Sequence, residues 1–75
     1  MRISDVMIHI QEPLSTAARS SLEDTLRGVD GVIAPRFGAG TEHLLLVAFD
    51  ADRVRPADLL AAVTQAGGHA QLVGL

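Results

Sequence analysis

The sequence contains no cysteine, no lysine, no tyrosine and no tryptophan. Without cysteine, neither a disulfide nor a thiolate metal site can form. The two phenylalanines offer little stacking surface for single-stranded nucleic acid. Six scattered arginines and a net charge of −3 argue against binding to a phosphate backbone, which needs clustered basic residues. We therefore expect no nucleic-acid partner.

Long apolar runs are also absent. No run approaches the roughly 18 residues needed to cross a bilayer, and residues 1–5 lack the apolar stretch of a signal peptide. These features predict a soluble cytoplasmic protein without membrane insertion. The 75 residues form one domain, 1–75, and a chain this short buries only about 60% of its unfolded surface. The apolar residues, 48% of the chain, must therefore build a single thin core.

Apolar periodicity predicts the first two elements. Apolar and polar residues alternate over residues 3–10, which is typical of a strand with one buried face. Ser15 is a favourable helix N-cap, and apolar residues then recur near helical spacing through residues 16–26. The chain is thus expected to begin with a strand and a helix.

The middle of the chain predicts two further strands. The strand expected at residues 32–37 contains Pro35, which lacks the amide hydrogen that a central strand needs, so it belongs at a sheet edge. Residues 38–41 are typical of a turn. Residues 43–49 are apolar on both faces, which favours a central strand.

The last third predicts a helix and a strand. Pro56 suits the first turn of a helix, Gly67 and Gly68 are expected to end it, and residues 69–73 supply the last strand. The order is βαββαβ, which right-handed crossovers turn into an antiparallel sheet of order 4-1-3-2 with both helices on one face. The sequence therefore predicts an α+β fold, the ferredoxin-like sandwich.

Four segments carry a resemblance to a known family. Residues 26–32 read Leu-Arg-Gly-Val-Asp-Gly-Val and resemble the "L-x-G-V-x-x-V" junction of heavy-metal-associated domains. Residues 47–50, 56–60 and 66–70 resemble the family's "V-x-(Y/F)-D", "P-x-x-L" and "A-G-Y-x-A" segments. This family includes copper chaperones and N-terminal modules of metal-transporting ATPases. The resemblance covers nearly the whole chain and implies the fold of a small metal carrier.

The resemblance also implies where the metal loop should lie. The family binds Cu(I) or Zn(II) through the two cysteines of M-x-C-x-x-C. Aligning the helices places these cysteines at Glu12 and Ser15 and the methionine at Ile10, while a one-residue offset places the cysteines at Gln11 and Leu14. Neither register contains a soft ligand. We therefore expect no Cu(I) carriage by thiolates and no resident cofactor.

Histidine offers another route to a metal ion. Strand alternation places His9 and His69 on the open sheet face, on adjacent strands and near the same end. The pair is a candidate site for Zn(II), Ni(II), Co(II) or Cu(II), with Glu12 or Glu42, or a symmetric partner, as further ligands. His43 is a weaker third candidate because its strand parity matches that of the helix-facing residues Leu45 and Val47. The alternative is that these are separate polar residues facing solvent.

The open sheet face is expected to be apolar, which suggests an interface. The side chains expected to project there are Met7, Ile33, Leu44, Leu46, Ala48 and Val73. The partner is a second copy of the chain or another protein of the same pathway. The alternative is that the leucines are ordinary exposed apolar residues.

Enzyme functions are not favoured. Ser15, His9 and either Asp5 or Asp50 make a hydrolase-like set only on paper, since no oxyanion motif surrounds Ser15 and N-capping already explains it. The glycines at 38 and 40 lack both the Lys-Ser/Thr tail of a phosphate loop and a following helix. The chain is therefore expected to have no catalytic residues.

A small-molecule regulatory domain of the amino-acid-binding type remains an alternative, because such domains share the βαββαβ order. They usually have glycine in the loop after the first strand. Here residues 12–14 of that loop are Glu-Pro-Leu, without glycine. A screen of amino acids against divalent metals by thermal shift separates this alternative from the others.

Overall fold

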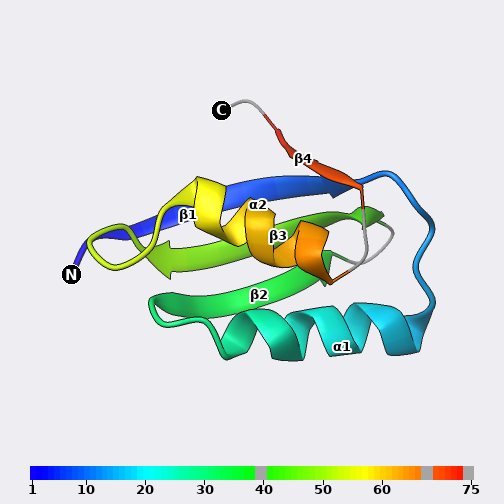
Figure 1. Ribbon diagram of the computed structural model, residues 1–75, viewed down its shortest axis with the longest axis horizontal. Helices are drawn as coiled ribbons and strands as arrows, with labels where there is room; N and C mark the ends of the chain where they lie inside the picture. The colour runs from blue at the N-terminus through cyan, green and yellow to red at the C-terminus, as the bar shows by residue number, and fades with distance from the viewer. Residues whose placement is uncertain (39–40, 67–68, 74–75) are drawn as a thin grey trace.

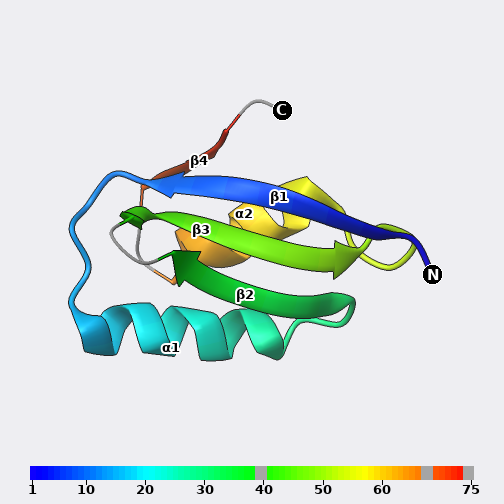
Figure 2. The ribbon, with the colours of Figure 1, turned by 180° about the vertical axis from the view of Figure 1, so that it is seen from behind.

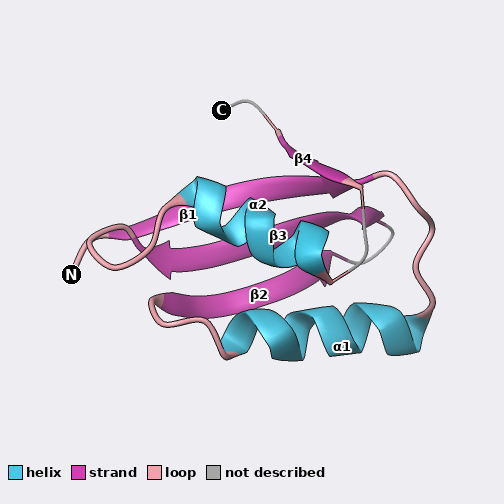
Figure 3. Cartoon of the chain, viewed as in Figure 1, coloured by secondary structure: helices cyan, strands magenta, loops and turns pink. Residues whose placement is uncertain are grey.

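The computed structural model describes residues 1–38, 41–66 and 69–73 of the chain. The helices and strands follow one another in the predicted βαββαβ order (Figures 1 and 3). The elements are β1 (Ile3–Ile10), α1 (Thr16–Arg27), β2 (Val32–Gly38), β3 (Thr41–Asp50), α2 (Pro56–Gln65) and β4 (Ala70–Leu72).

The four strands form one antiparallel sheet of order β2-β3-β1-β4. This is the predicted 4-1-3-2 order, and it confirms the ferredoxin-like fold. β1 and β3 are the central pair, aligned from Ile3 opposite Asp50 to His9 opposite Leu44. Seen from behind, β1 and β3 lie in front of α2, so this side of the sheet is not covered by that helix (Figure 2).

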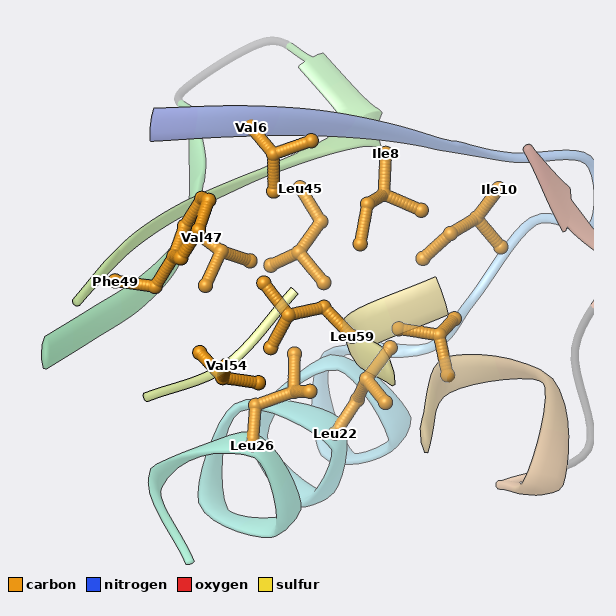
Figure 4. Packing of buried hydrophobic residues seen from close by; sticks show 11 residues of the cluster. Val6, Ile8, Ile10, Leu22, Leu26, Leu45, Val47, Phe49, Val54 and Leu59 are labelled. Atoms are coloured by element: carbon orange, nitrogen blue, oxygen red, sulfur yellow. The ribbon is translucent and has the colours of Figure 1, made fainter. Parts of the chain in front are cut away.

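The core fills the space between the other sheet face and both helices. Residues of β1 and β3 point toward residues of α1 and α2 (Figure 4). The buried apolar residues are Val6, Ile8, Ile10, Leu22, Leu26, Leu45, Val47, Phe49, Val54, Leu59 and Val63. Since this one cluster joins the two helices to the same sheet face, the opposite face is the open one.

The helix ends follow the local sequence. Ser15 is the N-cap of α1, its hydroxyl accepting a hydrogen bond from the Ala18 amide, and Gly28 is the C-cap. Pro56 opens α2, as predicted. The helix ends at Gln65, and the expected stop at residues 67–68 lies outside the described residues, as does the centre of the turn expected at 38–41.

β2 is an edge strand, as its proline predicts. Pro35 is buried and lies opposite Val47, and the Phe37 amide donates to the Glu23 carboxylate of α1 at 3.2 Å. The proline and this bond occupy two positions where another chain could pair with the edge. β2 therefore adds little unpaired backbone to the outside of the molecule.

Three strands differ from their predicted bounds, and β2 differs only by ending one residue later, at Gly38. β3 is longer than residues 43–49, because its pairing with β2 continues to Thr41 and its pairing with β1 to Asp50. β4 is shorter than residues 69–73, because only Ala70–Leu72 complete the ladder with β1, and His69 precedes the strand.

None of the helices in the described part of the chain is long and apolar enough to cross a membrane.

Candidate functional site

The loop between β1 and α1, residues 11–15, is the segment to which the resemblance assigned the metal loop. The Ser15 hydroxyl accepts from the Ala18 amide at 3.1 Å, which satisfies one of the free N–H groups at the start of α1. The Arg19 guanidinium donates to the Leu14 carbonyl at 2.7 Å. The end of this loop is therefore held by bonds to the first turn of the helix.

Glu12 ties the start of the loop to the segment before β4. Its carboxylate accepts from the His69 backbone N–H, at 2.8 and 3.1 Å to the two oxygens, and contacts Nδ1 of the His69 ring. The Gln11 amide donates to the His69 carbonyl at 2.8 Å. The His69 backbone N–H, followed by its ring, lowers the pKa of the Glu12 carboxyl. Both backbone polar groups of His69, just before β4, are thus hydrogen-bonded to the loop.

The packing of the loop bears on which positions correspond to the family's two cysteines, Glu12 and Ser15 or Gln11 and Leu14. Ile10 is buried, and Leu14 packs against the core, whereas Gln11 is exposed. The Gln11/Leu14 register would therefore need one cysteine directed at the core and one at solvent. Glu12 and Ser15 both keep their side chains outside the core, which favours the first register.

A pocket of about 300 Å³ lies beneath the same loop. Ile10, Leu14, Leu22 and Val63 contribute apolar walls, and Glu12 lies at its margin. The pocket is therefore a gap between the loop and the two helices with few polar groups. Among the described residues that line it, no set of groups is arranged to activate a nucleophile.

The three histidines make two separate contacts in the structure. His9 lies opposite Leu44 on one side and Gln71 on the other, and its ring stacks against His43, with ring centroids 6.1 Å apart and planes inclined by 22°. His69 instead contacts Glu12, and its side chain is 81% exposed. The structure therefore pairs His9 with His43 and His69 with Glu12.

His43 is held at its position by a backbone carbonyl. Its Nδ1 donates to the Ile10 oxygen at 2.9 Å, across the end of the β1–β3 ladder. Strand parity alone assigned His43 to the helix side, yet the residue is exposed because it lies where the core ends. His9 opposite Leu44 is the last pair of the β1–β3 register, so His43 lies one residue beyond that pair and diagonal to His9, a placement that the sequence alone did not show.

Metal-ligating groups are sparse elsewhere. Within residues 1–38, 41–66 and 69–73, no group of three or more His, Cys, Asp or Glu side chains could hold a metal ion together. Glu42, next to His43 in β3, is exposed. Any metal bound by the described side chains would thus have two protein ligands and take the others from water or a partner.

The hydrolase-like set is not assembled. Asp50 lies opposite Ile3, at the far end of the ladder from His9, and its carboxylate accepts from the Arg2 and Asp52 amides at 3.1 and 3.0 Å. Asp5 lies opposite Ala48, away from the Ser15 loop. Asp50 and Ser15 therefore have structural partners of their own, and Asp5 lies apart from the Ser15 loop.

The open sheet face has an apolar centre. Leu46 lies between Met7 of β1 and Arg36 of β2, and the Val73 amide donates to the Met7 carbonyl at 2.9 Å. The half-buried apolar residues of this face, which we call the open-face patch, are Met7, Leu44, Leu46, Ala48 and Val73.

Ile33, which was expected on that face, lies at an irregularity of the β2–β3 pairing. A β-bulge between Val32 and Ala34 makes Ile33 an extra residue, so that Ala34 and Arg36 lie opposite Ala48 and Leu46. Ile33 is 47% exposed and lines a shallow hollow with Met1 and Arg53. Ile33 therefore has no direct partner in the β2–β3 register, and its place on the open face stays a prediction.

Comparison with known proteins supports the fold. No protein-family model and no curated protein matches the chain. Among solved structures, a copper-binding domain from HMA7, a P-type ATPase, matches with a TM-score of 0.84 and 21% identity, covering 93% of each chain. Oxidised MerP from Ralstonia metallidurans CH34 matches with a TM-score of 0.83 and 18% identity, covering 95% of this chain and 97% of the other.

A third structure is the N-terminal domain of a potential copper-translocating P-type ATPase from Bacillus subtilis, in its Cu(I)-loaded state. It matches with a TM-score of 0.83 and 20% identity, over 95% of this chain and 88% of the other. These similarities confirm, for the fold, the resemblance seen at residues 26–32, 47–50, 56–60 and 66–70. The chain has the fold of the heavy-metal-associated domains, without the cysteine pair of the metal-binding motif.

Proposed function

We propose that this chain is a small non-catalytic binding or adaptor module that associates with a partner protein or a second copy through the open face of its sheet. The observation that carries this proposal is the open-face patch, on the side away from the core. Protein interfaces commonly have an apolar centre and a polar rim. Here Asp5 beside Ala48 and Arg36 beside Leu46 supply charged residues of opposite sign at the margin.

Substitution of Leu46 tests this function directly. Leu46 is central in the patch, so Leu46→Asp places a charge where an interface would exclude water, and it should abolish association. Ala17→Asp, on the exposed first turn of α1, adds the same charge away from the patch and serves as the control. Sedimentation equilibrium at high protein concentration measures self-association of the three proteins.

Two results are informative about the partner. A wild-type dimer that becomes monomeric only in Leu46→Asp supports self-association through the patch. Monomers in all three proteins rule out the homodimer. The patch is then tested by capturing partners with wild type and with Leu46→Asp as bait, and equal capture by both would rule out the open face as the interface.

A second candidate function is metal-ion binding or trafficking with imidazole ligands, for which the sequence nominated His9, His69 and His43. The specific observation in its favour is the contact of His9 with His43 near the missing thiolate loop, on the fold of proteins described as copper-binding. A thermal-shift screen of divalent metals against amino acids tests it. Stabilisation by metals alone supports this function, whereas stabilisation by an amino acid alone favours a small-molecule regulatory domain.

A further inference from the structure

The contact between His9 and His43 joins the ends of the two central strands. We propose that these two imidazoles form a binding site for a borderline divalent transition-metal ion, namely Cu(II), Ni(II) or Zn(II). This proposal rests on the second candidate function and specifies its residues. It replaces the expected His9–His69 pairing with the pair that the structure brings together.

The separation of the rings fits two ligands of one ion. A metal bound to a ring nitrogen at about 2.0–2.1 Å lies roughly 3.2 Å from the centre of that imidazole. Two such rings are therefore roughly 6.4 Å apart on opposite sides of an ion and roughly 5.2 Å apart at a tetrahedral angle. The observed 6.1 Å between the His9 and His43 centroids lies within this range, and because the two rings are stacked, the His9 ring has to turn for its nitrogen to face an ion bound to His43.

The hydrogen bond of His43 leaves its Nε2 nitrogen free to bind a metal ion. Because the Ile10 carbonyl can only accept, the Nδ1 of His43 must carry the hydrogen, and the lone pair of the neutral ring then lies on Nε2. A ring N–H donated to a backbone carbonyl is the usual support of a metal-bound histidine, since it fixes both tautomer and orientation. This bond holds the His43 ring ready to bind an ion through Nε2.

His9 provides the independent observation. Its Nδ1 is buried and is the one buried side-chain nitrogen or oxygen in the described part of the chain that has no hydrogen-bond partner. Buried polar atoms are nearly always paired, and an unpaired one often marks an absent water or ion. A metal ion held with His43 gives this nitrogen a partner.

The donor set selects the class of ion. Imidazole nitrogens suit copper, nickel and zinc, whereas Ca²⁺ and Mg²⁺ prefer oxygen ligands. With two protein ligands, the remaining coordination positions are open to water or to donors from a partner. Affinity should follow the general order for divalent ions, with Cu(II) bound more tightly than Ni(II) or Zn(II).

His69 is the natural control. Its Nδ1 already contacts Glu12, and its side chain is exposed to solvent. His69→Ala removes one imidazole from the same end of the protein without touching the proposed pair. The three variants His9→Ala, His43→Ala and His69→Ala can therefore be compared directly.

The test is a calorimetric titration of the wild type and the three variants with ZnCl₂ and, separately, with a Cu(II) salt, after circular dichroism has verified folding. We expect the dissociation constant to rise at least roughly tenfold in His9→Ala and His43→Ala and to stay unchanged in His69→Ala. Addition of Mg²⁺ in excess should not compete. Nitrogen-15 spectra of the wild-type histidine rings should show Zn(II) shifting the signals of His9 and His43 and not those of His69.

Each alternative outcome is distinct. Metal binding that survives His43→Ala, or that is lost in His69→Ala, overturns this site and leaves the metal-binding function standing. Absence of binding by the wild type overturns both. The ring spectra decide the question on the unmodified protein if a variant fails to fold.

Discussion

Restoring the two cysteines tests which loop positions correspond to the family's metal ligands. We expect the double variant Glu12→Cys/Ser15→Cys to bind one Cu(I) ion, and the double variant Gln11→Cys/Leu14→Cys to bind it at least roughly a hundredfold more weakly. The reason is geometric, because Leu14 packs against the core while Gln11 is exposed. A thiolate at position 15 also lies at the N-terminus of α1, which lowers a thiol pKa and favours the metal-binding form.

The stability cost can be worked out from the contacts that the first variant loses. Removing the Ser15 cap costs about 1 kcal/mol, within a range of about 0.5–2 kcal/mol, and replacing Glu12 also removes its hydrogen bonds with the His69 backbone N–H. Each kcal/mol corresponds to a fall of about 4–8 °C in the melting temperature of a domain this size. A 75-residue domain has a total stability of roughly 4–11 kcal/mol, so the variant should still fold.

Copper should reverse this loss. An ion that binds only the folded state stabilises it by about 2.7 kcal/mol at a free concentration one hundred times its dissociation constant. The melting temperature of the Glu12→Cys/Ser15→Cys protein should therefore fall below that of the wild type without copper and rise above it with Cu(I).

The assay is competition with a Cu(I) chelator under reducing conditions, paired with calorimetric melting. The wild type is the control, since it has no thiolate. Equal affinity of the two double variants, or tighter binding by Gln11→Cys/Leu14→Cys, would refute the register deduced from the packing of Leu14. Failure of both to bind would show that the loop conformation itself is incompatible with two thiolate ligands.

Three further predictions concern stability. Leu59→Ala, at a fully buried position of α2, should cost about 2–5 kcal/mol in urea unfolding, and a loss below 1 kcal/mol would contradict its place in the core. Gly31→Ala should cost at least about 1 kcal/mol, because Gly31 has a φ of +97° and an added Cβ would lie 2.9 Å from the Arg53 Cβ. The Asp52 backbone N–H holds the pKa of Asp50 below its usual range, so Asp50 should stabilise the protein above about pH 4, and this stabilisation should fade as the pH falls through the lowered value. Urea midpoints should therefore fall less steeply between pH 5 and about pH 3 in Asp50→Asn than in the wild type, and equal slopes would assign the acid sensitivity to other carboxyls.

The fold was predictable because each local signal agrees with the global one. Ser15 and Pro56 start the helices in the structure as they do in the sequence, and Pro35 places β2 at the sheet edge. Such signals act over a few residues, because they depend on local hydrogen bonds and on the backbone geometry of proline. Strand order then follows from the βαββαβ sequence and the handedness of its crossovers.

The candidate site was less predictable because it depends on departures from ideal alternation. The bulge at Ile33 changes the register of β2, and nothing in the apolar pattern of that strand marks it. His43 falls on the helix side by alternation, but beyond the last core residue of β3 the ring is free to bond the Ile10 carbonyl instead. Side-chain direction at a strand end is set by the nearest available partner and not by the pleat.

The loop and the histidine pair differ in what their polar atoms already bind. Ser15 bonds the helix and Glu12 bonds His69, so an ion at the loop would have to displace both contacts. His9 Nδ1 has no partner to lose. Substitutions of Ser15 or Glu12 should therefore lower stability without changing metal affinity, whereas substitution of His9 should change metal affinity with little effect on the stability of the metal-free protein. Substitution of His43 should change metal affinity and also remove its hydrogen bond to the Ile10 carbonyl. Measuring both quantities on both sets of variants separates a scaffold that has lost its metal site from one whose site has moved to the neighbouring strands.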